Sequence, residues 1–205
     1  KLDTVLTDMY EHLWLFVNNP EKDFTRKRKL DFKEMLNILL SMGGNSLKLE
    51  LMKYFSYDVE TATCAAFVQQ RGKILPKAFE FLFHKFTISA VSPNYYDGYR
   101  MLAVDGSDLC IAHNPKDTEN HFLATDNAKG FNLLHLNAMY DLCSRVYVDT
   151  IVQPGRKENE FQALTDMVDR SDIKEETIVI ADRGYESYNV FEHIEKKRWN
   201  YVIRV

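Results

Sequence analysis

Two aspartates stand at comparable places beside apolar runs. Asp105 follows the run in "RMLAVDG", and Asp182 follows the run in "TIVIADRGY". If both runs are strands that lie side by side in one sheet, the two carboxylates meet at the same edge. Adjacent carboxylates repel each other, and a divalent cation that prefers oxygen ligands, Mg²⁺ or Mn²⁺, removes that repulsion. The pair therefore predicts a metal site, and two such ions about 3.5–4 Å apart can drive phosphodiester cleavage.

Each aspartate taken alone also has a purely structural interpretation. Asp105 fits the start of a turn in "DGSD", and Asp182 fits the cap of a helix that begins near Ser187. Acidic residues at strand ends and helix starts are common. The metal hypothesis depends on the two aspartates together, at matching strand ends.

The second half of the chain predicts a mixed α/β fold. From residue 100 the apolar pattern has period two, in "RMLAVDG", "GFNLLHLNAMYD" and "RVYVDTIVQ". The third of these is expected to place Val146, Val148, Thr150 and Val152 on one side, and "DLCS" is expected to close a hairpin. A helix, the strand "TIVIAD", a second helix and the strand "NYVIRV" follow. The order β-β-β-α-β-α-β predicts a mixed sheet in which the first strand, ending at Asp105, is central and the fourth is its parallel neighbour.

The first half predicts a helical region, residues 1–92, joined to the sheet domain, residues 93–205, near "VSPNYYDGYR". "LDFKEMLNILLSMG" places Phe32, Met35 and Leu36 on one helical face and stops at two glycines. In "KAFEFLFHKF" the residues expected to pack inward are Phe79, Leu82, Phe83 and Phe86. Short helices with tight turns favour a helical bundle, of which a helix-turn-helix is one form.

The charge is unevenly distributed along the chain. Residues 1–100 carry a net charge of +2 and residues 101–205 a net charge of −6. A basic run covers residues 26–29, and Arg26 and Arg28 in it are candidate DNA contacts, as are Gln70, Arg71 and Lys73. Cations near helix starts suit phosphates, and Gln and Arg can read base edges. A solvated charged face is the alternative for these residues.

Composition excludes several other classes. The three cysteines show no CxxC spacing, which argues against a zinc site or a disulfide framework and suits a cytoplasmic protein. No apolar run approaches the roughly 18 residues of a membrane span, so no membrane partner is expected. His113 and His121 are expected in a loop and His135 in a strand, without companions at ligand spacing.

The stretches "VDGSDL", "KGFNLLHLNAMYDLCSRVYVDTIVQPGRKENEF" and "IADRGYESYNV" resemble the DDE transposases of bacterial insertion sequences. The resemblance is to the insertion sequence 4 family, to which Tn5 transposase is related. It implies a ribonuclease H-like core, Mg²⁺ or Mn²⁺ in a two-metal site, and Asp105 and Asp182 as catalytic metal ligands. It also implies double-stranded DNA as partner, both transposon end and target, with the basic N-terminal segment recognising the terminal repeats. A homodimer in the synaptic complex of the full-length protein and a bacterial, nucleoid-associated location are implied as well.

One departure from the family concerns its third acidic ligand, a glutamate on a helix after the fifth strand. This sequence stops at Val205, so we expect a fragment that binds metal weakly and is inactive by itself. Glu186 and Asp108 are nearby acids, but neither stands at the family's position. Further candidate contacts with the DNA backbone are Lys129, Arg156, Lys157 and Arg183.

Two other functions compete with the transposase hypothesis. A haloacid-dehalogenase-like phosphatase needs a second acid two positions after its nucleophilic aspartate, here Asp105. Ser107 occupies that position, and Asp108 comes one residue too late. A non-catalytic DNA-binding protein derived from a transposable element would keep the basic helical region without a complete catalytic site.

Overall fold

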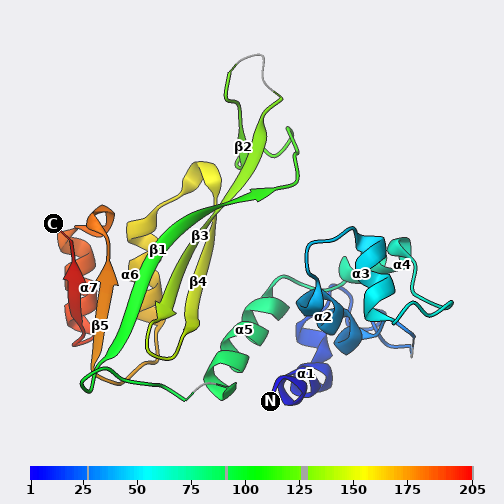
Figure 1. Cartoon of the computed structure of the whole chain (residues 1–205), viewed down its shortest axis with the longest axis horizontal. Helices are drawn as coiled ribbons and strands as arrows, with labels where there is room; N and C mark the ends of the chain where they lie inside the picture. Colours follow the sequence, from blue (N-terminus) through cyan, green and yellow to red (C-terminus); the bar gives the residue numbers. More distant parts are fainter. Residues whose placement is uncertain (27, 91, 126–128, 205) are drawn as a thin grey trace. The chain divides into compact units, whose positions relative to one another are not determined.

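The chain folds into two compact units, Lys1–Ala90 and Val91–Val205. The structure is a computed structural model, and it describes residues 1–26, 28–90, 92–125 and 129–204. Figure 1 shows helices in the first unit and a twisted sheet with the helices α6 and α7 in the second. In the described part of the chain, no helix is both long and apolar enough to cross a membrane.

The first unit is a helical bundle. Its elements are α1 (Leu2–Glu11), η1 (Leu13–Leu15), α2 (Phe32–Ser41), α3 (Leu47–Tyr54), α4 (Cys64–Arg71) and α5 (Lys77–Ala90). Helix α2 begins where Asp31 caps it by accepting the N–H of Glu34 at 2.8 Å. The sequence predicts an apolar face of Phe32, Met35, Leu36 and Leu39. The first three side chains are fully buried and Leu39 is partly buried against the same core, which confirms that face.

Helix α5 departs from its predicted packing. Phe79 and Phe86 are 37% and 39% exposed, whereas Ala78 and Leu82 are buried in the bundle core. Apolar side chains occupy more than one side of this helix, with Phe81 and Ile88 turned away from Phe79 and Phe86, so the sequence pattern does not by itself show which stripe packs inward. The prediction that Phe79 and Phe86 lie in the core is therefore wrong for the structure described.

The second unit is built on a six-stranded mixed sheet. Its elements are β1 (Arg100–Ile111), β2 (His121–Phe122), β3 (Phe131–Asp141), β4 (Val146–Pro154), η2 (Gly155–Lys157), α6 (Glu160–Arg170), β5 (Thr177–Ala181), η3 (Arg183–Tyr185), α7 (Tyr188–Lys196) and β6 (Asn200–Ile203). The strand order is β2-β3-β1-β5-β6, and β4 pairs with β3 on the side not taken by β1. β1 is antiparallel to β3 and parallel to β5, which confirms the predicted mixed α/β class, with β1 central and β5 as its parallel neighbour.

Helices α6 and α7 pack on the same face of this sheet. Leu102 and Val104 of β1 and Val179 of β5 share one buried core with Leu164 of α6 and Ile194 of α7. Residues alternate between the faces of a strand, so Met101, Ala103 and Asp105 lie on the opposite face. Met101 and Ala103 are only half-buried and Asp105 is exposed.

Three details of the strands differ from the sequence prediction. β1 does not end at Asp105 but continues to Ile111, because its antiparallel pairing with β3 runs on to Ile111↔Asn132 after the pairing with β5 has stopped. In Figure 1 this paired part of β1 and β3, the β1–β3 ribbon, extends away from β5 and β6. β4 pairs with β3 as far as Leu134↔Pro154, and β2 pairs with β3 beyond it. The short strand β2 beside it was not predicted.

The third difference is a bulge in β4. Met139 pairs with Asp149 and Tyr140 with Tyr147, which leaves Val148 as the extra residue. The predicted single-sided row of Val146, Val148, Thr150 and Val152 is therefore wrong. Val148 and Ile151 pack against the core, whereas Val152 is 57% exposed.

A buried ion pair joins the start of β1 to the end of β3. Nε of Arg100 donates to Oδ2 of Asp141 at 2.7 Å, and the two side chains are 10% and 0% exposed. The other oxygen, Oδ1 of Asp141, accepts the N–H groups of Cys143 and Ser144 in the hairpin turn.

We predict that Asp141→Ala lowers the free energy of unfolding of the sheet unit by about 3–5 kcal/mol, because it leaves Arg100 buried without this partner. Urea unfolding followed by the fluorescence of Trp199, which is buried in this unit, measures the loss in a Trp14→Phe background. Glu192→Gln is the control: it removes an exposed ion pair with Lys196 and should cause a much smaller loss. Equal losses for the two variants would contradict the account.

Candidate active site

Asp105 and Asp182 lie at matching heights on neighbouring parallel strands. β1 pairs with β5 from Arg100↔Thr177 to Ala103↔Ile180, and the same register continued by two residues brings Asp105 beside Asp182. The backbone of Asp182 is still extended, with φ −79° and ψ −179°. Neighbouring strands are about 4.8 Å apart, and side chains two residues apart on a strand share a face. Both carboxylates therefore belong to the face that α6 and α7 leave free.

One oxygen of each aspartate is held by its local backbone. Oδ1 of Asp105 accepts the N–H of Gly106 at 2.9 Å, and Oδ1 of Asp182 accepts the N–H of Gly184 at 2.8 Å. Among the described residues, neither Oδ2 has a hydrogen-bond or ion-pair partner. Two exposed, oriented carboxylates with free oxygens suit a hard cation such as Mg²⁺ or Mn²⁺, which prefers oxygen ligands. The residues present thus fit such an ion.

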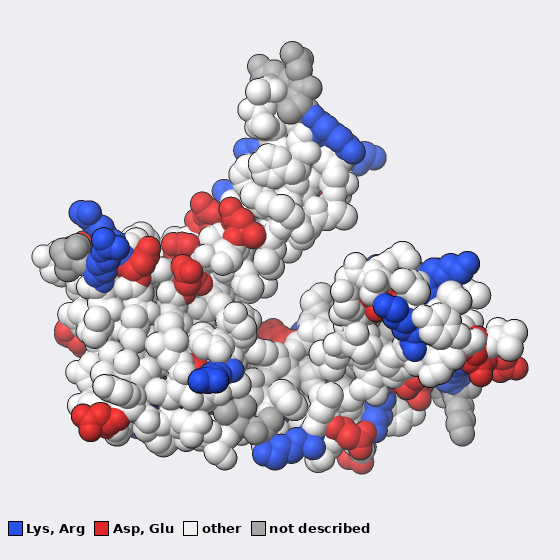
Figure 2. Space-filling model, viewed as in Figure 1, with Lys and Arg blue, Asp and Glu red and all other residues white. Residues whose placement is uncertain are grey.

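Acidic side chains gather at this end of the sheet. Figure 2 shows Asp and Glu clustered near the point where the β1–β3 ribbon extends away from β5 and β6. The acids around this point come from several elements: Asp105 and Asp108 from β1, Glu158 from the segment after η2, Glu160 from the start of α6, and Asp182 after β5. A cluster of this kind is repulsive unless cations compensate it.

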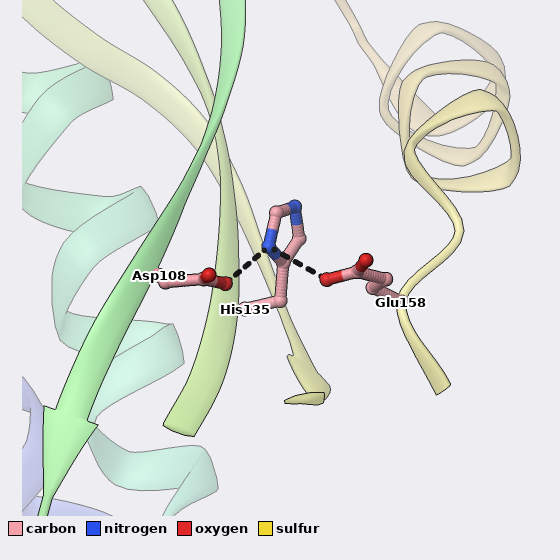
Figure 3. Close-up of side chains that lie close together, drawn as sticks. All are labelled: Asp108, His135 and Glu158. Carbon is pink, nitrogen blue, oxygen red and sulfur yellow. Dashed lines mark hydrogen bonds and ion pairs between the residues drawn. The ribbon is translucent and has the colours of Figure 1, made fainter. Parts of the chain in front are cut away.

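The helix-covered face carries a histidine between three carboxylates. Nδ1 of His135 lies 3.0 Å from Oδ1 of Asp108 and 3.4 Å from Oε2 of Glu158 (Figure 3). Nε2 lies 3.0 Å from Oε1 of Glu160. Burial alone would lower the pKa of His135, but the hydrogen bond to Asp108 and the charges of Glu158 and Glu160 together raise it above its ordinary value. The His135 cluster is named here for these four residues: Asp108, His135, Glu158 and Glu160.

Gly106 makes room for this cluster directly beside Asp105. A Cβ atom at residue 106 would lie 2.0 Å from Oε1 of Glu160 and 2.6 Å from Nε2 of His135. Any side chain there would push the Glu160–His135 pair off β1. The glycine of the "DGS" stretch is therefore required by packing against α6 and not by a turn, since β1 continues through it as a regular strand.

Tyr185 is buried close to the same carboxylates. Its side chain belongs to the sheet core and is 1% exposed, and among the described residues its hydroxyl has no hydrogen-bond partner. Burial is the main cause that raises the pKa of Tyr185, and the charges of Glu160, Asp105 and Asp182 raise it further. The hydroxyl therefore keeps its proton at neutral pH and is available as a donor.

In the first unit the structure brings several predicted DNA contacts together. Arg26, Arg28, Gln70 and Lys73 line one cavity of about 300 Å³, together with Glu21, Lys22, Phe24, Thr25 and Leu30. Nζ of Lys73 also lies 3.9 Å from Oδ1 of Asp23. Arg71 is exposed on α4 and does not line the cavity. Lys27, part of the same basic run, lies outside the described residues.

The remaining predicted DNA contacts do not form one group. Nε of Arg156 donates to the carbonyl of His121 at 2.6 Å, and its guanidinium lies over the ring of Phe122. Lys157 forms an ion pair with Glu119. Arg183 is exposed in η3, directly after Asp182, and Lys129 is exposed beyond β2. Arg156 and Lys157 are thus held by contacts within the chain.

Sequence reasoning missed the roles of His135, Glu158, Glu160 and Tyr185. His135 was expected in a strand and lies in β3, but its partners come from β1 and from the start of α6. One signal was present in the sequence: a glycine inside an apolar strand pattern indicates the close approach of another group. Which group approaches Gly106 depends on tertiary packing.

Comparison with known proteins identifies the sheet unit. The family model described as "Transposase DDE domain" matches residues 96–205, which is more than half of the chain. A search of curated protein sequences found no match. Among solved structures, a Mos1 transposase paired-end complex with left transposon end is similar, with 13% identity and a TM-score of 0.33. That match covers 86% of this chain and 59% of the Mos1 chain.

We predict that Gly106→Ala destabilises the sheet unit by about 1–3 kcal/mol, because its Cβ overlaps Glu160. Glu160→Ala in the same chain removes the clashing group, so the double variant should lose less than the sum of the two single losses. Urea unfolding of the four chains measures this coupling. Strict additivity would show that Glu160 does not lie over Gly106. Gly72→Ala, whose Cβ meets nothing closer than 3.5 Å, is the control for the substitution itself.

Proposed function

Because this chain belongs to the family of DDE transposases, we propose that it is part of a protein that cleaves DNA at the ends of a transposable element and joins the freed ends to target DNA. The insertion sequence 4 group is the proposed subfamily. The observation that carries the proposal is the register of β1 and β5, which sets Asp105 beside Asp182 on an uncovered face. Two strand-held carboxylates with free oxygens are what a metal-dependent phosphodiester reaction requires.

Asp105 and Asp182 are the proposed catalytic residues, and each would hold a divalent ion through its free Oδ2. Bound Mg²⁺ or Mn²⁺, as a pair in the complete enzyme, would supply activation of water or a 3′-hydroxyl and stabilisation of the leaving oxygen. The backbone N–H groups of Gly106 and Gly184 fix the orientation of the two carboxylates. A fixed orientation lowers the reorganisation needed when the reaction begins.

Double-stranded DNA is the proposed partner, and the cavity lined by Arg26, Arg28 and Lys73 is the proposed phosphate contact of the first unit. Three cations around one cavity can neutralise phosphate charge without reading sequence. Gln70 and Arg71 on α4 are proposed to approach base edges. In the second unit, Arg183 is the proposed backbone contact nearest the catalytic pair, with Lys129, Arg156 and Lys157 along the ribbon.

Two carboxylates are fewer oxygen ligands than Mg²⁺ or Mn²⁺ takes in a complete protein site. We therefore propose that Asp105 and Asp182 alone bind metal weakly and do not by themselves support cleavage. In a longer protein that supplies the glutamate, a homodimer would pair two transposon ends. Without a third ligand anywhere in the natural protein, the alternative is a DNA-binding protein that retains the cationic cavity and no catalysis.

We predict that Asp105→Asn and Asp182→Asn each weaken Mn²⁺ binding at least about tenfold, since loss of even an outer-shell partner typically costs 10–100-fold. Titration followed by the electron paramagnetic resonance of free Mn²⁺ measures the affinity. Asp166→Asn, an exposed carboxylate on α6, is the matched control and should leave it unchanged. Equal Mn²⁺ affinity in all three variants would contradict the proposed metal ligands.

A separate prediction concerns DNA. Arg26→Gln combined with Arg28→Gln should weaken binding to a fluorescent 30-base-pair duplex of arbitrary sequence and lower the salt slope by about 1–2, because each lost phosphate contact removes about 0.9. Fluorescence anisotropy at several salt concentrations measures both, with Lys196→Gln as control. An unchanged salt slope would contradict the proposal that this cavity contacts DNA phosphates. A lowered slope in a chain without an Asp105- and Asp182-dependent Mn²⁺ site would favour the non-catalytic alternative.

A further inference from the structure

Two carboxylates converge on one nitrogen of His135. Oδ1 of Asp108 and Oε2 of Glu158 lie 3.0 Å and 3.4 Å from the same atom, Nδ1 (Figure 3). A ring nitrogen carries at most one hydrogen, which points along one direction. A single N–H therefore cannot serve both acceptors well. A cation in front of Nδ1 can contact the nitrogen and both oxygens at once.

The separations between these three atoms suit common coordination of one ion. Ligand atoms about 2.1 Å from a tetrahedral ion are about 3.4 Å from one another, and in octahedral geometry adjacent ligands are about 3.0 Å apart. All three ligand atoms lie within 4.8 Å of one another. The side chains of Asp108 and Glu158 are 52% and 55% exposed. Small rotations of these two exposed side chains would bring both oxygens to an ion bound by the buried imidazole.

The second ring nitrogen is held as in many metal-bound histidines. Nε2 of His135 lies 3.0 Å from Oε1 of Glu160. A metal-binding imidazole commonly gives its other N–H to a carboxylate, which fixes the ring and leaves the lone pair of the first nitrogen for the metal. The His135 side chain is only 8% exposed, so the ring cannot swing away from this position. Gly106 keeps the space that the Glu160–His135 pair occupies.

An independent observation concerns a buried hydrogen-bond acceptor on the same face of the sheet. Oδ1 of Asn137 is buried and has no hydrogen-bond partner among the described residues. Nδ2 of Asn137 must face Oε1 of Gln153, which already accepts the N–H of Asn159, so the amide cannot turn round to satisfy its oxygen. Asn137 is the β3 partner of Gly106, over which Oε1 of Glu160 lies. Oδ1 of Asn137 can therefore accept a hydrogen bond beside the His135 cluster, for example from a water bound to a cation.

We propose that Asp108, His135 and Glu158 bind a divalent transition ion of the Zn²⁺ class, with Glu160 as the positioning residue for the imidazole. The nitrogen ligand favours such an ion over Mg²⁺. This site lies on the opposite face of β1 from Asp105 and does not depend on the proposed catalytic pair. The bound ion would join the β1–β3 ribbon, through Asp108 and His135, to the segment between η2 and α6, through Glu158.

The test uses Co²⁺ as a spectroscopic probe of the chain carrying Asp105→Asn and Asp182→Asn, which removes the proposed catalytic ligands. We expect one equivalent to bind, with a visible absorption band of nitrogen and oxygen ligation, and Zn²⁺ to displace it. Adding Asp108→Asn and Glu158→Gln, both exposed and compatible with folding, should weaken Co²⁺ binding at least about tenfold. Glu160→Gln should weaken it while keeping the absorption band, and Asp166→Asn should change neither.

Two results would overturn the proposal. One is the absence of saturable Co²⁺ binding in the Asp105→Asn, Asp182→Asn chain, which would leave His135 as an imidazolium between carboxylates. The other is Co²⁺ affinity that Asp108→Asn and Glu158→Gln do not change. Neither result bears on the proposed transposase function, which stands or falls on Mn²⁺ binding by Asp105 and Asp182.

Discussion

The parallel pairing of β1 with β5 is the constraint on which the site depends. Asp105 and Asp182 are far apart in the sequence, and only the in-register contact of these two strands sets them side by side. The core residues Leu102, Val104 and Val179 hold that contact because they pack against α6 and α7 on one face. Burial of this face stabilises the sheet, and the aspartates on the other face remain accessible. Apolar packing thus maintains an arrangement of charges that would otherwise separate.

Around Asp105 the two faces of β1 carry different chemistry. The free face presents two carboxylates, each of which keeps one oxygen without a partner among the described residues. The covered face presents the His135 cluster, in which an imidazole lies among three carboxylates. Gly106 contributes to both sites. Its N–H orients Asp105, and the absence of a side chain leaves room for Glu160. One short stretch of β1 therefore shapes both sites, and the acidic charge of each favours cations.

Local patterns in the sequence predicted much of the fold. The apolar run before Asp182 indicated a buried strand, and the alternation in "GFNLLHLNAMYD" indicated the strand that pairs with β1. The sequence predicted that β1 ends at Asp105, but the strand continues to Ile111 because it pairs with β3, and the local pattern does not show that pairing. The bulge at Val148 is likewise set by its partner strand. The exposure of Phe79 and Phe86 reflects a choice among apolar faces of α5 that periodicity alone does not make.

The candidate site was predicted in part for the same reason. Asp105 and Asp182 could be singled out because strand order brings matching strand positions together. The partners of His135 come from β1, from the segment after η2 and from the first residue of α6. No spacing in the sequence connects these positions, so the cluster appears only once α6 lies on the sheet. The aspartate pair depends on topology, whereas the histidine cluster depends on packing.

The central claim is that Asp105 and Asp182 share a metal-binding edge, and a Mn²⁺-soaked crystal of this chain tests it most directly. The account predicts an anomalous peak in contact with both aspartates and a carboxylate separation within about 6 Å, since one ion binds oxygens at a little over 2 Å. Carboxylates far apart, or on opposite faces of the sheet, would contradict the register on which the proposed function rests. Close carboxylates with manganese bound only elsewhere would contradict their role as ligands.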